Sequence, residues 1–362
     1  DAVSLQLTIS SRNYDSIIRS RLYWAFFVDL GGLRLLAVDA RHLSKTFQTK
    51  QGQVQAVQDV SFAVASGEIF GILGPNGAGK STTILILTTL LRATGGSAQI
   101  LGFDVEQDDA KVRAKIGVAL QETGIDEILT GRELLQSTGR LWGLGKQEAQ
   151  HRSDELLQLV RLTDTADRRV KTYSGGMKRR LDLALSLVHQ PKVLFLDEPT
   201  TGLDPGSRRV LWDEILRLRD AGVTIILTTQ YLEEADELAD RIAIIHEGRM
   251  VSEGTPDELK TSIGGDVVAF SFATEEVTRQ AAKIAPDAEV FETELRITVQ
   301  NGPQFIPELF SKFVSAGIDV IAVSSSKPTL DDVFLKVTGF TLENAEERGS
   351  RLPHGNSAGD RS

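Results

Sequence analysis

A glycine-rich stretch of the chain has the residue types and spacing of a phosphate-binding site. Residues 74–81 read GPNGAGKS, which matches the pattern G-x-x-x-x-G-K-[ST]. Glycines let successive backbone N–H groups turn inward around a phosphate, and a helix that begins there adds a partial positive charge. Lys80 can reach the β- and γ-phosphates of a nucleotide, and the Ser81 hydroxyl can ligate Mg²⁺. The candidate nucleotide-binding residues of this phosphate loop are Gly74, Pro75, Asn76, Gly77, Ala78, Gly79, Lys80, Ser81 and Thr82.

Two adjacent carboxylates end a second apolar run. Residues 193–198 read VLFLDE, a pattern typical of a buried strand that ends in acids. Beside a phosphate loop, the first carboxylate can hold Mg²⁺ and the second can polarise an attacking water. We therefore expect Asp197 to hold Mg²⁺ and Glu198 to act as the catalytic base. A turn with no chemical role is the simpler alternative, but the phosphate loop upstream favours the catalytic interpretation.

The sequence around these residues predicts the elements that must position them. Residues 69–74 form a short apolar run before the phosphate loop, and residues 83–91 carry apolar side chains at helical spacing after it. Further apolar runs end at Asp197 and Thr229, separated by helix-like segments. This alternation of strands and helices predicts a parallel sheet with helices on both faces.

The ends of the chain follow different patterns. Residues 265–340 predict strands and helices in the order β-α-β-β-α-β with a closing helix, which is a small α+β domain of about 75 residues. Residues 341–362 are polar and are expected to be disordered. Residues 1–36 contain an aromatic cluster within YWAFFV, and we interpret them as an extension or a loosely packed arm. An anchor at a lipid surface is the alternative, although no amphipathic period supports it.

Composition excludes several classes of protein. The net charge of −10 has the wrong sign for a chain that mainly binds nucleic acid, so no nucleic acid partner is expected. The absence of cysteine excludes a disulfide framework, a thiolate metal site and a thiol nucleophile. The apolar run at residues 23–28 is far shorter than the ~20 residues that span a bilayer, so we do not expect the chain to cross a membrane by itself.

Residues 173–181, which read YSGGMKRRL, resemble the LSGGQ signature of the ATP-binding cassette (ABC) ATPases. We call them the signature turn, and Ser174 precedes Asp197 by 23 residues. The resemblance covers residues 37–262. It implies a P-loop NTPase cassette with a mixed sheet core and a helical subdomain at about residues 122–190. It also implies Mg²⁺ and a head-to-tail homodimer in which ATP lies between the phosphate loop of one subunit and the signature turn of the other.

The same resemblance suggests roles for single residues. Phe47 resembles the aromatic that stacks on adenine, although an aromatic on a strand is more often a packing residue. Gln121 resembles the glutamine that contacts Mg²⁺ and the attacking water, and Asp204 belongs to a loop that crosses the dimer interface. Gln230 stands where the family usually has a histidine that contacts the γ-phosphate, and a neutral amide can donate a hydrogen bond there but cannot carry a proton. The signature residues expected to contact ATP are Ser174, Gly175 and Gly176.

Longer stretches resemble the ATP-binding subunits of daunorubicin/doxorubicin-resistance exporters of the ABC-2 type. They include residues 228–260, TGREL at residues 130–134 and SKPTLDDVFLKVTG at residues 326–339. The resemblance implies an ATPase that powers a separate multi-spanning permease from the cytoplasmic face of the membrane. It would export drugs or other hydrophobic compounds. Residues 122–136 are the candidate docking segment for that permease, with a solvated helical surface as the alternative.

Two other classes of ABC ATPase remain as alternatives. An ATPase acting on DNA or ribosomes is disfavoured because the interval from Lys80 to Ser174 has no sustained heptads and the chain has only one phosphate loop. The lack of cysteine also excludes the zinc modules of excision-repair relatives. An importer subunit is disfavoured only by the resemblance to exporters. We predict that ATPase activity tolerates Gln230→His, is largely lost in Glu198→Gln, and loses nucleotide binding in Lys80→Ala.

Overall fold

The computed structural model describes residues 36–50, 52–121 and 124–339. The aromatic cluster of the predicted N-terminal extension lies outside these residues. So do the predicted disordered tail and the first two residues of the candidate docking segment. No helix within the described ranges combines the length and the apolarity needed to cross a bilayer.

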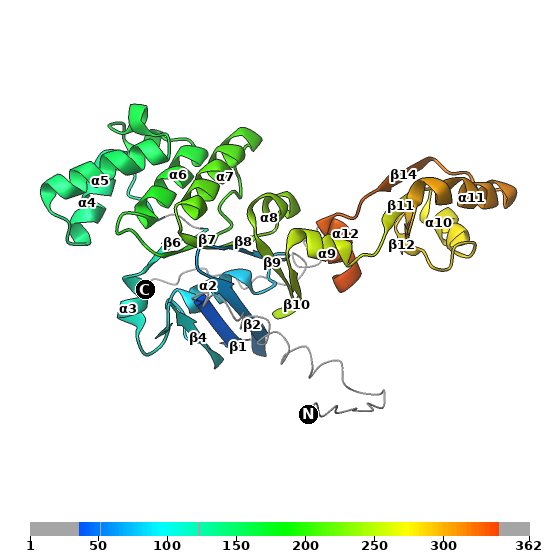
Figure 1. Cartoon of the computed structure of the whole chain (residues 1–362), viewed down its shortest axis with the longest axis horizontal. Coiled ribbons are helices and arrows are strands. Elements are labelled where there is room, and N and C mark those ends of the chain that lie inside the picture. The colour runs from blue at the N-terminus through cyan, green and yellow to red at the C-terminus, as the bar shows by residue number, and fades with distance from the viewer. Residues whose placement is uncertain (1–35, 51, 122–123, 340–362) are drawn as a thin grey trace, which may run out of the picture.

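A mixed sheet forms the centre of the larger part of the molecule (Figure 1). Within the described residues it has ten strands. Their spatial order is β5 (Phe103–Asp104), β4 (Gly95–Ile100), β1 (Leu36–Thr49), β2 (Gly52–Ala65), β10 (Arg249–Gly254), β9 (Arg241–His246), β3 (Ile69–Leu73), β8 (Thr224–Thr229), β7 (Val193–Asp197) and β6 (Ile116–Ala119).

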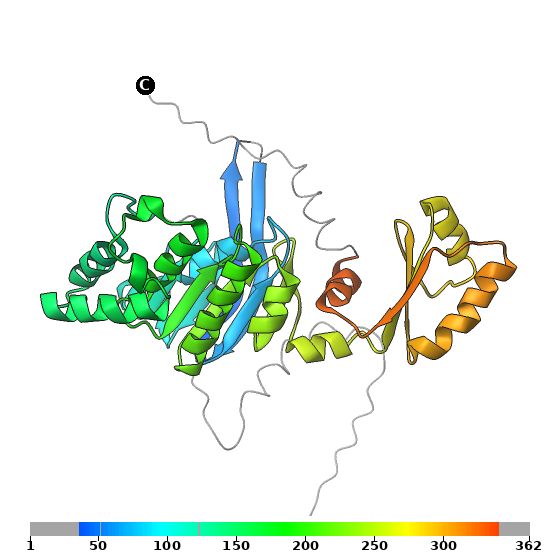
Figure 2. The same cartoon turned by 90° about the horizontal axis from the view of Figure 1, so that it is seen from above.

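The strands that carry the candidate site run parallel to one another. β9, β3, β8, β7 and β6 are parallel, so their carboxyl ends meet at the same edge of the sheet. The phosphate loop follows β3, Asp197 ends β7 and Thr229 ends β8. The remaining strands pair mainly in antiparallel fashion, and the β1–β2 hairpin extends beyond the rest of the sheet (Figure 2).

Each parallel strand is buried on both faces. Along β7, Phe195 packs in one apolar cluster with Phe70 and Ile84, whereas Leu194 packs in the other with Leu181. Successive side chains of a strand point to opposite faces, so an uninterrupted apolar run requires helices on both sides. α2 (Lys80–Leu87) covers the first face, and α6 (Gly175–Ser186), α7 (Pro205–Asp220) and α8 (Leu232–Leu238) cover the second (Figure 1).

A helical layer lies beside α6. α4 (Gly131–Leu141) begins with a capping box between Thr130 and Glu133, and Arg132 in its first turn pairs with Asp154 and Asp167. The layer also contains α5 (Lys146–Leu159) and two 3₁₀ turns (Thr163–Thr165 and Val170–Thr172). It joins the core because apolar residues of α4, α5 and α6 belong to one cluster. α3 (Asp109–Arg113) lies outside this layer, and its buried Val112 packs in the cluster that contains Phe70 and Phe195.

A second, antiparallel sheet occupies the C-terminal region. Its four described strands lie in the order β12 (Glu289–Phe291), β13 (Glu294–Val299), β11 (Asp266–Ser271) and β14 (Ala322–Ser326). α10 (Glu275–Ala282) and α11 (Gly302–Ser315) contribute to its own small core, in which Phe313 packs edge-on against Phe270 and Phe272. The predicted fold class, a mixed sheet with a helical layer followed by a small α+β region, is confirmed.

The closing helix leaves this small core and packs on the larger one. In α12 (Leu330–Thr338), the buried residues Leu330, Val333 and Phe334 belong to the same apolar cluster as α8 and α9 (Pro256–Thr261). Lys336 also donates a hydrogen bond to the Ser262 carbonyl at 3.1 Å. The chain thus returns from the small sheet to the larger part of the molecule at α12 (Figure 1). The predicted domain bounds at residues 262 and 265 remain a prediction.

Candidate active site

The phosphate loop passes too close to neighbouring backbone for side chains at two of its glycines. A Cβ atom at Gly74 would lie 2.3 Å from the carbonyl oxygen of Ile245 in β9, and one at Gly79 would lie 2.4 Å from that of Ala56 in β2. Gly79 also has a φ of +103°, which side chains disfavour. The loop therefore turns tightly over the end of β3 and leads directly into the N-terminus of α2.

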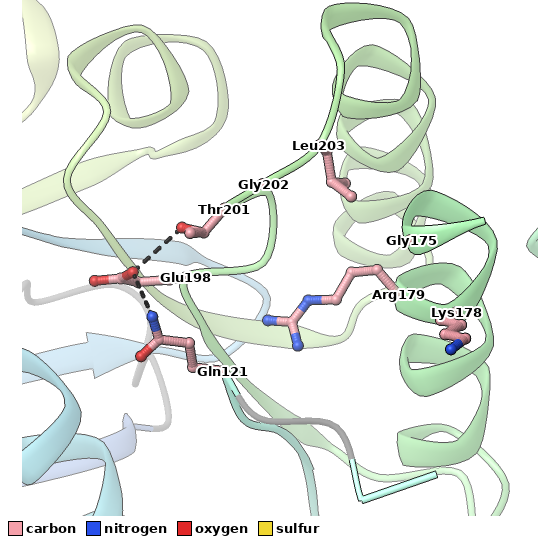
Figure 3. A pocket seen from close by; sticks show the side chains of 8 residues that line it. All are labelled: Gln121, Gly175, Lys178, Arg179, Glu198, Thr201, Gly202 and Leu203. Carbon is pink, nitrogen blue, oxygen red and sulfur yellow. Dashed lines mark hydrogen bonds between the residues drawn. The ribbon is translucent and has the colours of Figure 1, made fainter. Parts of the chain in front are cut away.

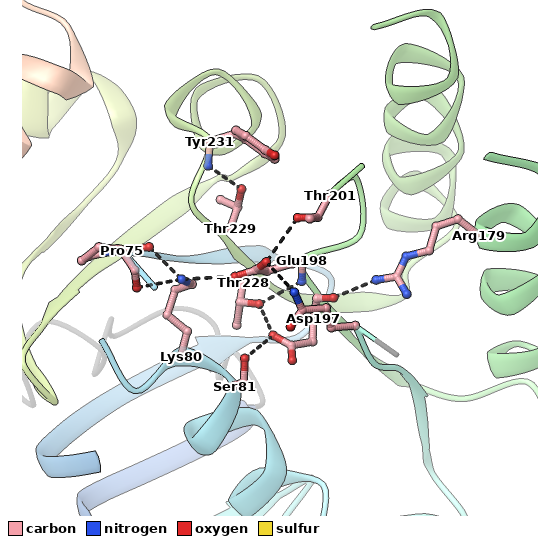
Figure 4. Close-up of polar contacts among 12 residues, drawn as sticks. Pro75, Lys80, Ser81, Arg179, Asp197, Glu198, Thr201, Thr228, Thr229 and Tyr231 are labelled. Carbon is pink, nitrogen blue, oxygen red and sulfur yellow. Dashed lines mark hydrogen bonds and ion pairs between the residues drawn. The ribbon is translucent and has the colours of Figure 1, made fainter. Parts of the chain in front are cut away.

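The Lys80 ammonium group lies at the centre of the site. Lys80 is only 4% exposed, and its Nζ donates hydrogen bonds to the carbonyl oxygens of Gly74 at 2.7 Å and Pro75 at 3.0 Å. It also lies 3.3 Å from Glu198 Oε1 (Figure 4). These contacts hold the positive charge of Lys80 between the phosphate loop and the Glu198 carboxylate. From there it can attract a phosphate group that binds at the loop.

Asp197 faces two hydroxyl groups. Its Oδ1 accepts a hydrogen bond from Ser81 Oγ at 3.1 Å and another from Thr228 Oγ1. Carboxylate and hydroxyl oxygens are the ligands that Mg²⁺ prefers, so Asp197 and Ser81 fit this ion. No group of three or more His, Cys, Asp and Glu side chains gathers anywhere in the described part of the chain. A metal here would need further ligands from water and phosphate, as Mg²⁺ usually does.

Glu198 is held in a strained conformation by contacts on every side. Its φ of +47° lies in the left-handed region, which costs a residue other than glycine about 1–3 kcal/mol. Its backbone N–H donates to the Thr228 carbonyl oxygen at 3.1 Å, and its Oε2 accepts from Gln121 Nε2 at 3.3 Å and Thr201 Oγ1 at 3.2 Å. In this conformation the carboxylate meets the phosphate loop at Lys80, whose Nζ lies 3.3 Å from Glu198 Oε1.

A cavity of about 230 Å³ opens beside Glu198. Figure 3 shows Glu198 and Gln121 on one side of it and α6 on the other. The cavity can admit a small group next to the candidate base. Its lining residues are Gln121, Gly175, Lys178, Arg179, Glu198, Thr201, Gly202 and Leu203.

The signature turn and the loop before α7 present exposed helix N-termini. Ser174 caps α6 by accepting from the Met177 N–H at 3.3 Å. Asp204 caps α7 by accepting from the Ser207 N–H at 3.0 Å, and the hydrogen bonds from Ser207 hold the pKa of Asp204 below its usual value. Gly176 is buried against Ser207, so the two N-termini are packed together. Ser174, Gly175 and Asp204 remain exposed.

Two segments of the chain match known protein families. Residues 57–201 match the ABC transporter family, and residues 254–338 match the C-terminal domain of DrrA1-3-like ATP-binding proteins. The daunorubicin resistance ATP-binding protein DrrA2 of Streptomyces coeruleorubidus is 44% identical over 312 residues, which cover 84% of this chain and 97% of that protein. The chain belongs to the ABC transporter ATP-binding proteins. Its cassette, meaning the ten-stranded sheet with its helices, therefore binds and hydrolyses ATP.

Other relatives extend the comparison. The linearmycin resistance ATP-binding protein LnrL of Bacillus subtilis (strain 168) is 35% identical over 84% of this chain and 99% of that protein. An ATP-binding subunit of an ABC transporter has a solved structure that matches with a TM-score of 0.56. It is 28% identical and covers 63% of this chain and 93% of its own. A dimeric post-hydrolysis cassette bound to ADP and Pi matches with the same TM-score, at 25% identity over 60% of this chain and 98% of its own.

The fold of the cassette brings together five of the residues that the sequence indicated. Lys80, Ser81, Gln121, Asp197 and Glu198 come from three segments and are connected by the contacts described above (Figures 3 and 4). They form a continuous polar group at the carboxyl edge of the parallel strands. The roles assigned to them remain predictions.

No hydrogen bond or ion pair joins that group, within the described residues, to Phe47, Gln230, Asp204 or the signature residues Ser174, Gly175 and Gly176. Phe47 lies near the end of the β1–β2 hairpin, 37% exposed, with the Lys45 ammonium 5.3 Å from its ring centroid. Gln230 follows β8, and its Oε1 atom is buried without a hydrogen-bond partner among the described residues. The signature residues and Asp204 have no hydrogen bond to the phosphate loop within the described chain.

Three further residues, for which the sequence predicted no role, support the site. Thr228 donates to Asp197 and accepts from the Glu198 N–H, and Thr201 donates to Glu198. Arg179 contacts the backbone on both sides of Glu198. A hydroxyl at the end of a buried strand was a usable signal for Thr228, whereas nothing in the local pattern distinguishes Arg179 from Arg180.

Proposed function

We propose that the chain is the ATPase subunit of an ABC-2 type exporter and powers a separate multi-spanning permease. It would bind peripherally at the cytoplasmic face of the membrane and drive the export of drugs or other hydrophobic compounds. The resistance proteins that it resembles over more than four-fifths of its length support this export role. The observation that carries the ATPase part is the contact of buried Glu198 with both Lys80 and Gln121.

The geometry suggests which residue would carry out each part of ATP hydrolysis. Ser81 and Asp197 would hold Mg²⁺, which neutralises charge on the phosphate oxygens when it is bound. Lys80, together with the N–H groups of the phosphate loop, would bind the β- and γ-phosphates. Glu198 would accept the proton of a water that Gln121 helps to orient. Gln230, at the end of the neighbouring strand, would donate a hydrogen bond to the γ-phosphate.

A head-to-tail homodimer would complete the site. Ser174 and Gly175 are exposed at the N-terminus of α6, where backbone N–H groups and the helix dipole favour an anion. Because they make no hydrogen bond to their own phosphate loop, we propose that they contact the ATP bound by a second copy. The dimeric cassette with ADP and Pi that this chain resembles supports such an assembly.

Transport in liposomes tests the export role directly. The full chain is reconstituted with the membrane permease that co-purifies with it in detergent, and movement of a dye-like hydrophobic cation is followed. We expect ATP-dependent movement away from the side that carries the ATPase, and none with Lys80→Ala. Movement toward that side would indicate an importer. A nucleic acid or ribosome in place of a permease would contradict the transporter role.

A histidine at position 230 is expected to be tolerated. Both side chains can donate a hydrogen bond to a phosphate oxygen, so Gln230→His should keep the hydrolysis rate within about threefold of the wild type. Gln230→Ala removes the donor and should lower the rate about tenfold, the effect of one hydrogen bond to a charged group. Phosphate release at saturating ATP measures the hydrolysis rates of both variants. Wild-type activity in Gln230→Ala would show that this side chain does not contact the γ-phosphate.

A further inference from the structure

The guanidinium group of Arg179 connects the signature helix to both sides of the candidate base. Arg179 is only 9% exposed, and its Nε donates to the Pro199 carbonyl oxygen at 2.9 Å while its Nη2 donates to that of Asp197 at 2.7 Å. These two carbonyl groups flank Glu198 in the chain. Nη1 donates to the carbonyl oxygen of Leu120, the residue before Gln121. One side chain therefore holds the backbone next to two residues of the proposed hydrolytic machinery.

The cation is buried at a cost that its ion pair only partly offsets. Burial lowers the pKa of Arg179, and burial raises the pKa of Asp182, its partner at 3.3 Å, to about 6. A buried charge is tolerated where it forms good hydrogen bonds. The planar guanidinium group of arginine can donate hydrogen bonds to three separate carbonyl groups at once. The single ammonium group of lysine matches this arrangement poorly.

The neighbouring Arg180 has a different set of contacts. Its Nη1 donates to the carbonyl oxygens of Val160 at 2.9 Å and Arg161 at 3.3 Å, at the end of α5. It does not line the cavity beside Glu198. The two arginines thus share a helix and a charge and also bond to main-chain carbonyls, but only Arg179 reaches the site.

We infer that Arg179 is a positioning residue through which the signature helix sets the geometry of Glu198 and Gln121. The inference rests on the proposed ATPase dimer. Ser174 caps the same helix and lies five residues before Arg179, and in that dimer Ser174 contacts the nucleotide of the second copy. A displacement of α6 caused by that nucleotide is transmitted by Arg179 to the base of its own subunit. Arg179 therefore couples the two ATP sites.

The test compares Arg179→Met, Arg179→Lys and the matched control Arg180→Met in the full chain. Steady-state hydrolysis is measured over a range of MgATP concentrations, MgATP affinity is measured separately, and thermal unfolding checks the fold. Arg179→Met should lower kcat about 10- to 100-fold, as expected for a displaced catalytic group, with MgATP affinity within about threefold of the wild type. Its Hill coefficient should fall to about 1 from a higher wild-type value.

The two control variants decide between positioning and general destabilisation. Arg179→Lys can still donate to part of the carbonyl set and should recover part of the kcat and of the cooperativity, and Arg180→Met should keep both. Wild-type kcat and Hill coefficient in Arg179→Met would overturn the inference. Equal losses in Arg180→Met, or a non-cooperative wild type, would do so as well. If the wild type does not hydrolyse ATP at all, the proposed function fails instead, which is a distinguishable result.

Discussion

Replacing Glu198 with glutamine is expected to remove most ATP hydrolysis while ATP still binds. The glutamine side chain keeps the size of Glu198, and its carbonyl oxygen can still accept a hydrogen bond from Gln121 or Thr201, but it cannot take a proton from water. Loss of a general base typically lowers kcat about 10²- to 10⁴-fold. Phosphate release at saturating ATP should show this loss. Equilibrium binding of MgATP should stay within about tenfold of the wild type, because Lys80 and the phosphate loop are intact.

The matched control for this variant is Glu237→Gln. Glu237 lies exposed on α8, away from the contacts around the phosphate loop, and its loss removes the same formal charge. Its hydrolysis rate should equal that of the wild type. Unchanged hydrolysis in Glu198→Gln would show that another group takes the proton and that the strained backbone at Glu198 serves a different purpose.

Replacing Lys80 with alanine is expected to abolish ATP binding, and hydrolysis with it. The ammonium group is the positive charge that the structure places at the phosphate loop, 3.3 Å from Glu198. Its removal deletes the contact to the phosphates and leaves a buried carboxylate without its cation, next to a polyanionic ligand. Truncation of one partner of a buried charge pair costs about 2–5 kcal/mol, so the Kd for MgATP should rise at least about 30-fold.

Direct binding measured by calorimetry, rather than activity, checks this prediction. Lys111→Ala is the control, because Lys111 is largely exposed and pairs with Asp108 on the surface. It should leave the Kd unchanged. The two main predictions also test each other, since Glu198→Gln should lose hydrolysis but not binding, whereas Lys80→Ala should lose both. Nucleotide affinity that survives Lys80→Ala would place the phosphates elsewhere.

The parallel strands and the phosphate loop could be predicted because their signals are local. The glycine spacing at residues 74–81 depends on backbone conformations that few other sequences can adopt, and the apolar runs before Asp197 and Thr229 require burial on both faces. Parallel strands have their carboxyl ends at one edge of the sheet, which is why the sequence predicts that Asp197 and Glu198 lie next to the phosphate loop. Phe47 was indicated only by resemblance, and the structure leaves its contact with adenine as a prediction.

The contacts between segments that are distant in the chain could not be predicted from the sequence, for a physical reason. Arg179 and Arg180 are adjacent and chemically identical, and only the crossing of α6 over the ends of β6 and β7 directs the first to Leu120 and Pro199. In the same way, the sequence predicts a closing helix, but the cluster that receives Phe334 of α12 includes residues of α8 and α9, far earlier in the chain. Periodicity specifies that a face will be buried and does not specify its partner.

The sequence by itself therefore determined the chemistry of this protein. A phosphate loop, a signature turn and an acidic strand end, in this order along the chain, are the pattern of an ABC ATPase, and each depends on residue types at short spacing. Only the tertiary structure decided how these parts act on one another. It placed Lys80 against Glu198, strained the backbone of the candidate base and connected it to α6 through Arg179. Such contacts depend on the packing of distant segments, which no local pattern encodes.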